Sequence, residues 1–164
     1  MKTLYLIGGT MGVGKTAVCQ ELKRMLVGSV FLDGDWCWDA NPFCITDETK
    51  KMVVDNVCHI LNNFLSCSAY EYVIFCWVMH KQEIIDGILN RLNVTDCAVK
   101  VVSLVCDERT LRIRLQKDID NGIREANVIE RSIERMKSVQ QLATLKIDTT
   151  DMSIDEVARQ ILKI

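Results

Sequence analysis

A cluster of glycines followed by Lys-Thr constrains this chain more than any other feature of its sequence. Residues 6–19 read LIGGTMGVGKTAVC, and positions 8–14 hold four of the eight glycines among 164 residues. Glycine inside an ordered element costs stability, so such a cluster needs a backbone reason. An apolar run precedes it and a helix-like pattern follows it. The order of these patterns predicts a strand, a glycine-rich turn and then a helix.

The turn matches the pattern of a phosphate-binding loop, Gly-x-x-x-x-Gly-Lys-Thr. Backbone N–H groups in such a turn curl inward as an anion nest, and the following helix adds unpaired donors. Lys15 would supply a charge for the β- and γ-phosphates, and the Thr16 hydroxyl would ligate Mg²⁺. We therefore predict ATP and Mg²⁺ as cofactors, with a nucleotide-binding set of Gly9, Thr10, Met11, Gly12, Val13, Gly14, Lys15, Thr16 and Ala17.

The composition excludes several classes of protein. A net charge of −2 gives no general attraction to nucleic acid or anionic membranes, so we expect neither as a partner. No apolar run approaches the roughly 20 residues that cross a bilayer. The eight cysteines include no CxxC pair, and a chain of this size and apolar content does not need a disulfide framework. These features predict reduced thiols and a cytoplasmic protein.

Apolar runs alternate with amphipathic segments along the whole chain. The runs cover 3–7, 29–32, 72–78, 99–105 and 144–147, and they lack alternating polarity, as parallel strands covered on both faces do. Apolar residues recur at helical spacing from Val53 to Phe64, from Ile129 to Ala143 and from Ile154 to Leu162. A Ser153–Glu156 capping box precedes the last of these segments. The pattern predicts an α/β three-layer sandwich in a single domain, 1–164. Ligands should bind at the carboxyl ends of the strands.

A second polar motif, LDGD at residues 32–35, stands where the second strand should end. In such a sheet this position lies beside the phosphate loop. Asp33 could hold the Mg²⁺ shell, directly or through water. Asp35 could accept the proton of a substrate hydroxyl as that hydroxyl attacks the γ-phosphate. The alternative is an ordinary turn, because Asp and Gly are frequent turn residues.

Together the two motifs resemble those of the small P-loop kinases. This group includes the nucleoside-monophosphate, shikimate, gluconate and adenylylsulfate kinases and chloramphenicol phosphotransferase. The resemblance implies the P-loop NTPase fold, with strand order 2-3-1-4-5 and a mobile lid. The chain departs from the group at Cys76–His80, which lacks the Asp-Gly of many nucleoside-monophosphate kinases. It also has Trp36-Cys37-Trp38 where gluconate kinases have other residues.

Arginines gather after the fourth strand, around residues 108–126, where the lid is expected. Arginine forks suit the spreading charge of a transferring phosphoryl group. The resemblance favours Arg114 as a catalytic and nucleotide-binding residue, with Arg124 next and Arg112 as a further candidate. Arg131 and Arg135 follow on the next helix and could also reach the nucleotide. The alternative is a solvated helix, because acidic residues interleave with these arginines.

All three tryptophans fall beside the predicted acceptor side, just after strand two or at the end of strand three. Trp36 and Trp77 are the predicted substrate residues beside Asp35, because indoles stack on bases, rings or sugar faces. The alternative is plain packing under a loop. His80 follows the third strand and could touch the substrate, although a place at the surface or as a cap is the expectation.

The predicted activity is ATP- and Mg²⁺-dependent transfer of the γ-phosphate to a hydroxyl or phosphate of a small molecule. A nucleoside or nucleotide leads the acceptor classes, followed by a sugar acid or an antibiotic-like alcohol. Lys15, Asp35 and Arg114 form the predicted catalytic set, and Thr16 and Asp33 the metal set. The alternative is a nucleotide-binding module or switch with only slow hydrolysis.

Overall fold

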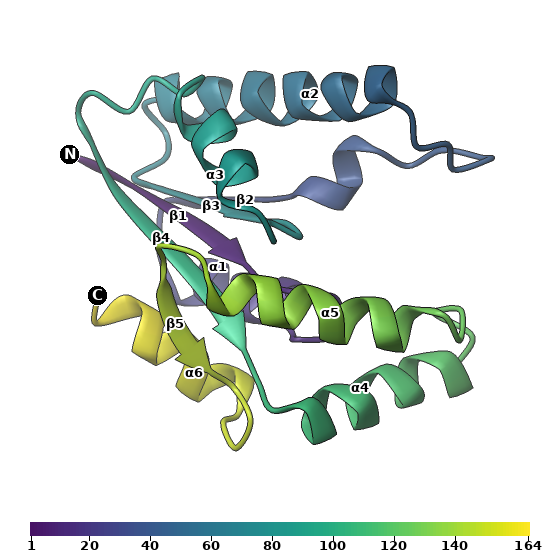
Figure 1. Ribbon diagram of the computed structural model, residues 1–164. Coiled ribbons are helices and arrows are strands. Elements are labelled where there is room, and N and C mark those ends of the chain that lie inside the picture. Colours follow the sequence, from purple (N-terminus) through teal and green to yellow (C-terminus); the bar gives the residue numbers. More distant parts are fainter.

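One five-stranded parallel sheet forms the centre of the molecule. The computed structural model describes residues 1–164 and orders the strands β2-β3-β1-β4-β5 (Figure 1). This order confirms the one that the resemblance implied. The strands are β1 (Lys2–Gly8), β2 (Ser29–Asp33), β3 (Tyr72–Cys76), β4 (Cys97–Val105) and β5 (Leu145–Asp148).

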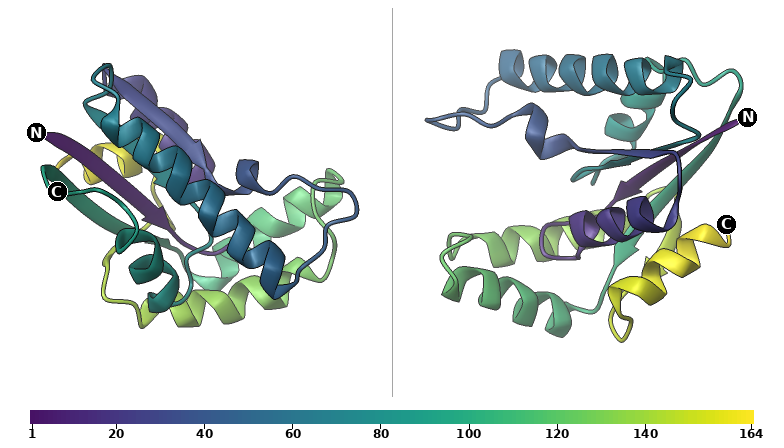
Figure 2. Two further views of the ribbon diagram at one scale, coloured as in Figure 1. Left: turned by 90° about the horizontal axis from the view of Figure 1, so that it is seen from above. Right: turned by 180° about the vertical axis from the view of Figure 1, so that it is seen from behind.

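Helices cover both faces of the sheet, which gives the three predicted layers (Figures 1 and 2). α1 (Lys15–Met25) and α6 (Ile154–Leu162) pack together on one face. α2 (Asp47–Ser66), α3 (Gln82–Leu89) and α5 (Val128–Gln140) cover the other, as right-handed crossovers require for this strand order. α4 (Glu108–Asp120) packs on α5, and a short 3-10 helix, η1 (Gly34–Cys37), follows β2.

The central strand shows why its sequence is continuously apolar. Five consecutive β1 residues, from Leu4 to Gly8, are buried, so side chains pointing to either face meet a helical layer. The capping box is also confirmed, since the Ser153 side chain accepts the Glu156 N–H and the Glu156 side chain accepts the Ser153 N–H. No helix combines the length and the hydropathy that a membrane span needs.

Two predicted boundaries were wrong. The third strand ends at Cys76 rather than at residue 78, because its partner β2 ends at Asp33, the residue paired with Cys76. The α5 face does not include Ala143. The helix ends at Gln140, Ala143 is exposed, and Leu142 fills the core position instead.

Candidate active site

The phosphate-binding loop lies between β1 and α1, at the carboxyl edge of the sheet. Gly9, Gly12 and Gly14 have φ angles of 141°, 79° and 100°. A Cβ on Gly9 would lie 2.7 Å from the carbonyl oxygen of Leu104, so a side chain would press on the backbone of β4. The first turn of α1 has neither a side-chain cap nor an acidic residue. Its N–H groups are therefore available to an anion.

The side chains of Lys15 and Thr16 bind different partners, one within the loop and one at the end of β2. Lys15 Nζ donates to the carbonyl oxygen of Thr10 at 2.8 Å, which holds the ammonium group across the loop. Burial lowers the pKa of Lys15, while nearby Cys76, Asp35 and Asp33 act in the opposite direction. Thr16 Oγ1 donates to Asp33 Oδ2 at 2.7 Å. The structure thus brings the predicted metal pair together.

Asp33 and Asp35 are joined by the first turn of η1. Asp33 is 5% exposed, and its Oδ1 accepts the Asp35 N–H at 3.1 Å. Asp35 is exposed, and its Oδ1 accepts a hydrogen bond from Trp77 Nε1 at 3.1 Å. A Cβ on Gly34 would lie 2.5 Å from Trp77 Cγ, so the glycine leaves room for the indole. This segment forms a helical turn that orients the Asp35 carboxylate.

The pKa of Asp35 depends on the partial burial of its carboxyl group and on nearby charges of both signs. Loss of solvation around the carboxyl group and, next, the Asp33 charge raise the Asp35 pKa. Lys15, the Trp77 hydrogen bond and Arg124 offset part of that rise. A carboxylate with a raised pKa accepts a proton more readily, which suits a general base.

Replacing the indole at position 77 tests this arrangement. Trp77→Phe removes a hydrogen bond that lowers the pKa of Asp35, so the pKa rises further. A base works only when deprotonated, so activity should be lost at a higher pH as the solution is acidified. We expect the acid limb of the pH–rate profile of kcat/KM to move upward. Trp36→Phe is the matched control, and equal profiles for the two variants would contradict the assignment.

A cavity of about 400 Å³ lies beside the loop, between α1 and α4. Of the predicted lid arginines, Arg114 and Arg124 line it and Arg112 does not. Arg112 is bound instead to Glu108 at 2.9 Å and Glu130 at 2.8 Å, the solvated pairing that interleaved charges indicated.

The two cavity arginines have different partners. Arg114 donates to Thr149 Oγ1 at 3.0 Å and to its carbonyl oxygen at 2.8 Å, and to the Val13 carbonyl at 3.4 Å. These bonds fix Arg114 between the loop and the end of β5.

Arg124 pairs with Asp118 at 3.0 Å and is close enough to lower the pKa of both Lys15 and Asp35. Arg124 therefore lies near Lys15 and Asp35, whereas Arg114 is held at the edge of the cavity beside the loop.

Positive side chains also gather beyond the end of β3. Arg135 of α5 lies near His80, and its charge, after burial, lowers the pKa of that imidazole. Arg131 likewise lowers the pKa of Arg135, after the larger effect of burial. Neither arginine forms an ion pair or a side-chain hydrogen bond with another residue. His80 is half-buried and its Nδ1 has no hydrogen-bond partner, so it is neither the surface residue nor the cap that was predicted.

The tryptophans separate into different environments. Trp77 contacts the Asp35 carboxylate, but Trp36 is 55% exposed and packs edge-on against Phe31 with ring centroids 5.2 Å apart. Trp36 lines a different cavity, of about 450 Å³, on the loop after β2. The structure therefore brings Trp77, rather than Trp36, to the predicted base.

One site residue, Thr149, was missed in the sequence. Its hydroxyl and carbonyl oxygens accept hydrogen bonds from Arg114. Its position directly after the fifth strand was the signal that could have indicated it.

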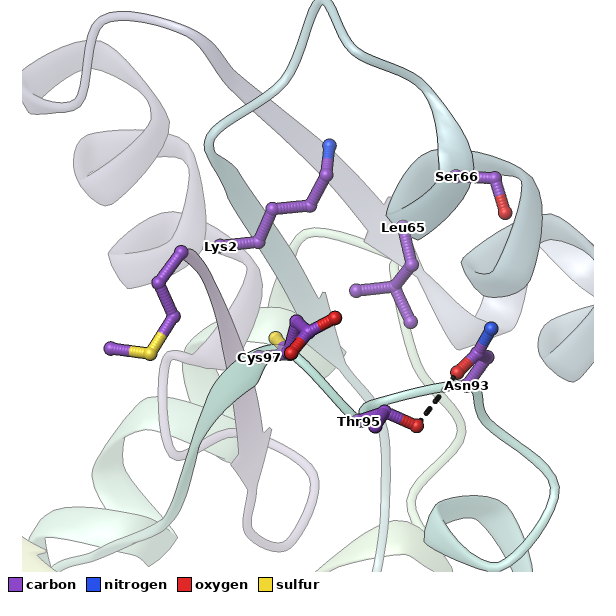
Figure 3. A pocket seen from close by; sticks show the side chains of 8 residues that line it. Lys2, Leu65, Ser66, Asn93, Thr95 and Cys97 are labelled. Atoms are coloured by element: carbon purple, nitrogen blue, oxygen red, sulfur yellow. Dashed lines mark hydrogen bonds between the residues drawn. The ribbon is translucent and has the colours of Figure 1, made fainter.

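Another cavity, of about 330 Å³, lies at the opposite end of the sheet, where Lys2 begins β1 and Cys97 begins β4 (Figure 3). It is remote from the loop, because the carboxyl ends of all strands share the other edge.

Comparisons with known proteins agree with this geometry. A sequence profile described as AAA domain (AAA_18) matches residues 6–137. A shikimate kinase of Bacillus cytotoxicus is 28% identical over 172 residues, covering 99% of this chain and 98% of its own.

Solved structures share the fold at lower identity. The tunicamycin resistance protein of Deinococcus radiodurans has a TM-score of 0.76 at 19% identity and covers 99% of this chain and 95% of its own. A gluconokinase of Sinorhizobium meliloti has a TM-score of 0.72 at 16% identity and covers 98% of this chain and 90% of its own.

Proposed function

This chain belongs to the AAA domain family, and we propose that it is a kinase that transfers the γ-phosphate of ATP to a small-molecule acceptor. One observation carries the proposal: a continuous hydrogen-bonded path from Thr16 through Asp33 to Asp35. The path ends at the backbone N–H of Asp35, the residue whose carboxyl group has a raised pKa. A nucleotide-dependent switch needs the loop but has no use for such a base. The relatives named as kinases support the same class.

The residues divide the transfer between them. An acceptor oxygen forms a bond to the γ-phosphorus while the bond to the bridging oxygen breaks, and ADP departs with that electron pair. Asp35 takes the proton of an attacking hydroxyl. Lys15, the loop amides and Arg124 stabilise the negative charge that spreads over the phosphoryl oxygens. We propose residues 108–126 as the lid that carries Arg124 over the site.

The donor set fits Mg²⁺. Thr16 and Asp33 offer a hydroxyl and a carboxylate oxygen, the hard ligands this ion prefers. The chain has no cluster of three or more His, Cys, Asp or Glu that could hold a metal alone. Mg²⁺ sites of this kind share the ion between one or two protein oxygens and the nucleotide phosphates. When bound, the ion neutralises charge on the β- and γ-phosphates.

The charge of the acceptor can be inferred from two arginines that lie beyond the end of β3. Arg131 and Arg135 are unpaired cations near the end of β3, which favours an acceptor that carries an anionic group. A nucleotide has such a group, and so does a sugar acid, the second class. A neutral antibiotic-like alcohol fits this cluster less well. A screen of these acceptors for ADP release tests the proposal.

Removing the metal, or its hydroxyl ligand, tests the cofactor assignment. We expect excess EDTA to stop acceptor-dependent ADP formation and added Mg²⁺ to restore it. Thr16→Ala should raise the Mg²⁺ concentration for half-maximal rate, because one oxygen ligand is lost. Thr95→Ala, which removes an exposed hydroxyl at the opposite end of the sheet, is the control. Turnover that is indifferent to EDTA would remove the metal from the mechanism.

A further inference from the structure

A separate apolar cavity of about 470 Å³ lies between α2 and α3. Both helices cover the same face of the sheet (Figure 1). Val53 and Val54 line it from α2, Ile84 and Gly87 from α3, and two indoles, of Trp38 and Trp77, border it. Its volume is that of a small-molecule site, and such sites are mostly apolar with few polar groups. The charged lining residues are exposed ones: Lys50, Lys81 and Glu83.

Trp77 connects this cavity to the candidate base. Its ring lines the cavity, while its Nε1 donates to Asp35 Oδ1 at 3.1 Å. The indole packs directly on Gly34 of η1, because a Cβ there would lie 2.5 Å from Trp77 Cγ. One side chain thus borders both the cavity and the carboxylate that would receive the acceptor's proton.

Gly87 keeps the cavity open. A glycine within a helix lowers its stability relative to alanine, so it needs a reason. Gly87 lies inside α3, it does not have a positive φ, and a Cβ placed on it would have no atom within 4 Å. Neither backbone conformation nor close packing therefore requires a glycine. Its missing side chain leaves space in the cavity wall.

We propose that this cavity is the specificity pocket of the acceptor and that it takes an apolar, ring-sized group. The inference rests on the proposed kinase function. An acceptor bound with its ring between α2 and α3 would present its hydroxyl to Asp35 past the edge of Trp77. A polyhydroxylated acceptor would place hydroxyl groups against Val53, Val54 and Ile84, whose side chains offer no hydrogen bond, and the charged lining residues are all exposed ones. The cost of such burial selects against polyols.

The first experiment measures binding without turnover. The probe is anilinonaphthalene sulfonate, whose fluorescence rises in apolar sites. Gly87→Trp should fill the cavity without a backbone clash and weaken probe binding by about tenfold or more. Asp86→Trp is the matched control, because it adds the same side chain at an exposed position of α3 outside the cavity, and it should bind like the wild type. ATP affinity should be the same in all three proteins, which shows that the fold and the loop are intact. Equal probe affinity in Gly87→Trp and the wild type would overturn the proposal.

The second experiment compares acceptors by ADP release. The panel pairs alcohols that carry an aryl group and an anionic group with shikimate and gluconate. We expect the aryl alcohols to stimulate the wild type and Asp86→Trp, and Gly87→Trp to raise their KM by about tenfold or more. Preference for shikimate or gluconate, unaffected by Gly87→Trp, would overturn the pocket but leave the kinase proposal standing. If no acceptor stimulates ADP release, the kinase proposal fails, and probe binding alone decides whether the cavity binds apolar groups.

Discussion

Lys15→Ala is expected to lower acceptor-dependent turnover by at least about 10²–10³-fold, the usual loss when one group that stabilises transition-state charge is removed. The ammonium group lies across the phosphate loop, 2.8 Å from the carbonyl oxygen of Thr10, where it would meet the β- and γ-phosphates. ATP binding should weaken as well, because the charge also contacts the ground state. Turnover by coupled ADP release and ATP affinity by calorimetry measure the two effects.

The fold should tolerate this change, since Lys15 makes a single side-chain bond within its own loop. Lys23→Ala, on the exposed last turn of the same helix, is the matched control and should retain wild-type turnover. Thermal unfolding of both variants checks their stability. Wild-type turnover in Lys15→Ala would contradict the assignment of the loop to the nucleotide.

Asp35→Asn is expected to separate catalysis from nucleotide binding. Asparagine keeps the size of the side chain and its acceptor oxygen for Trp77, but it loses the charge and the basicity. Acceptor-dependent ADP formation should fall by about 10²–10⁴-fold, the usual span for loss of a general base. ATP affinity should change little, because Lys15 and the loop amides hold the phosphates. Paired titrations of ATP binding and acceptor turnover measure both.

Two further variants make the result specific. Asp33→Asn should instead change the dependence on Mg²⁺ concentration, because Asp33 is bound to the Thr16 hydroxyl. Asp39→Asn, an exposed carboxylate on the loop after η1, should behave like the wild type. Full acceptor-dependent turnover in Asp35→Asn would show that this segment is only a turn and that the base lies elsewhere.

Local sequence patterns were sufficient to predict the layered α/β architecture and the glycine-rich turn, whereas the strand order came from the resemblance to the small P-loop kinases. The glycine spacing of the loop and the continuous apolar strands have only a few structural solutions, because backbone conformation and two-sided burial determine them. The same holds for the Thr16–Asp33 pair. Asp33 ends β2 and Thr16 lies in the first turn of α1, which follows β1, and the carboxyl ends of parallel strands share one edge of the sheet.

The side chains that complete the site could not be predicted in this way. The choice between Arg112 and Arg124 depends on which acidic partner each one reaches, and that is decided by how α4 packs on α5. Trp36 and Trp77 are both near Asp35 in the sequence or the sheet. Only Trp77 packs on Gly34, because its ring occupies the place of the missing Cβ. Gly87 gives no local signal at all, because its importance lies in a cavity formed with a distant helix.

The most direct test of the account follows the phosphoryl group itself. Wild-type protein, ATP and Mg²⁺ are incubated with each acceptor of the panel, and ADP and phosphorylated acceptor are measured together by mass spectrometry. The account predicts that at least one acceptor raises ADP formation far above the basal rate, with one phosphorylated acceptor formed for each ADP. ADP formation at one slow rate with every acceptor and with none, and without a phosphorylated product, would contradict it and support the switch.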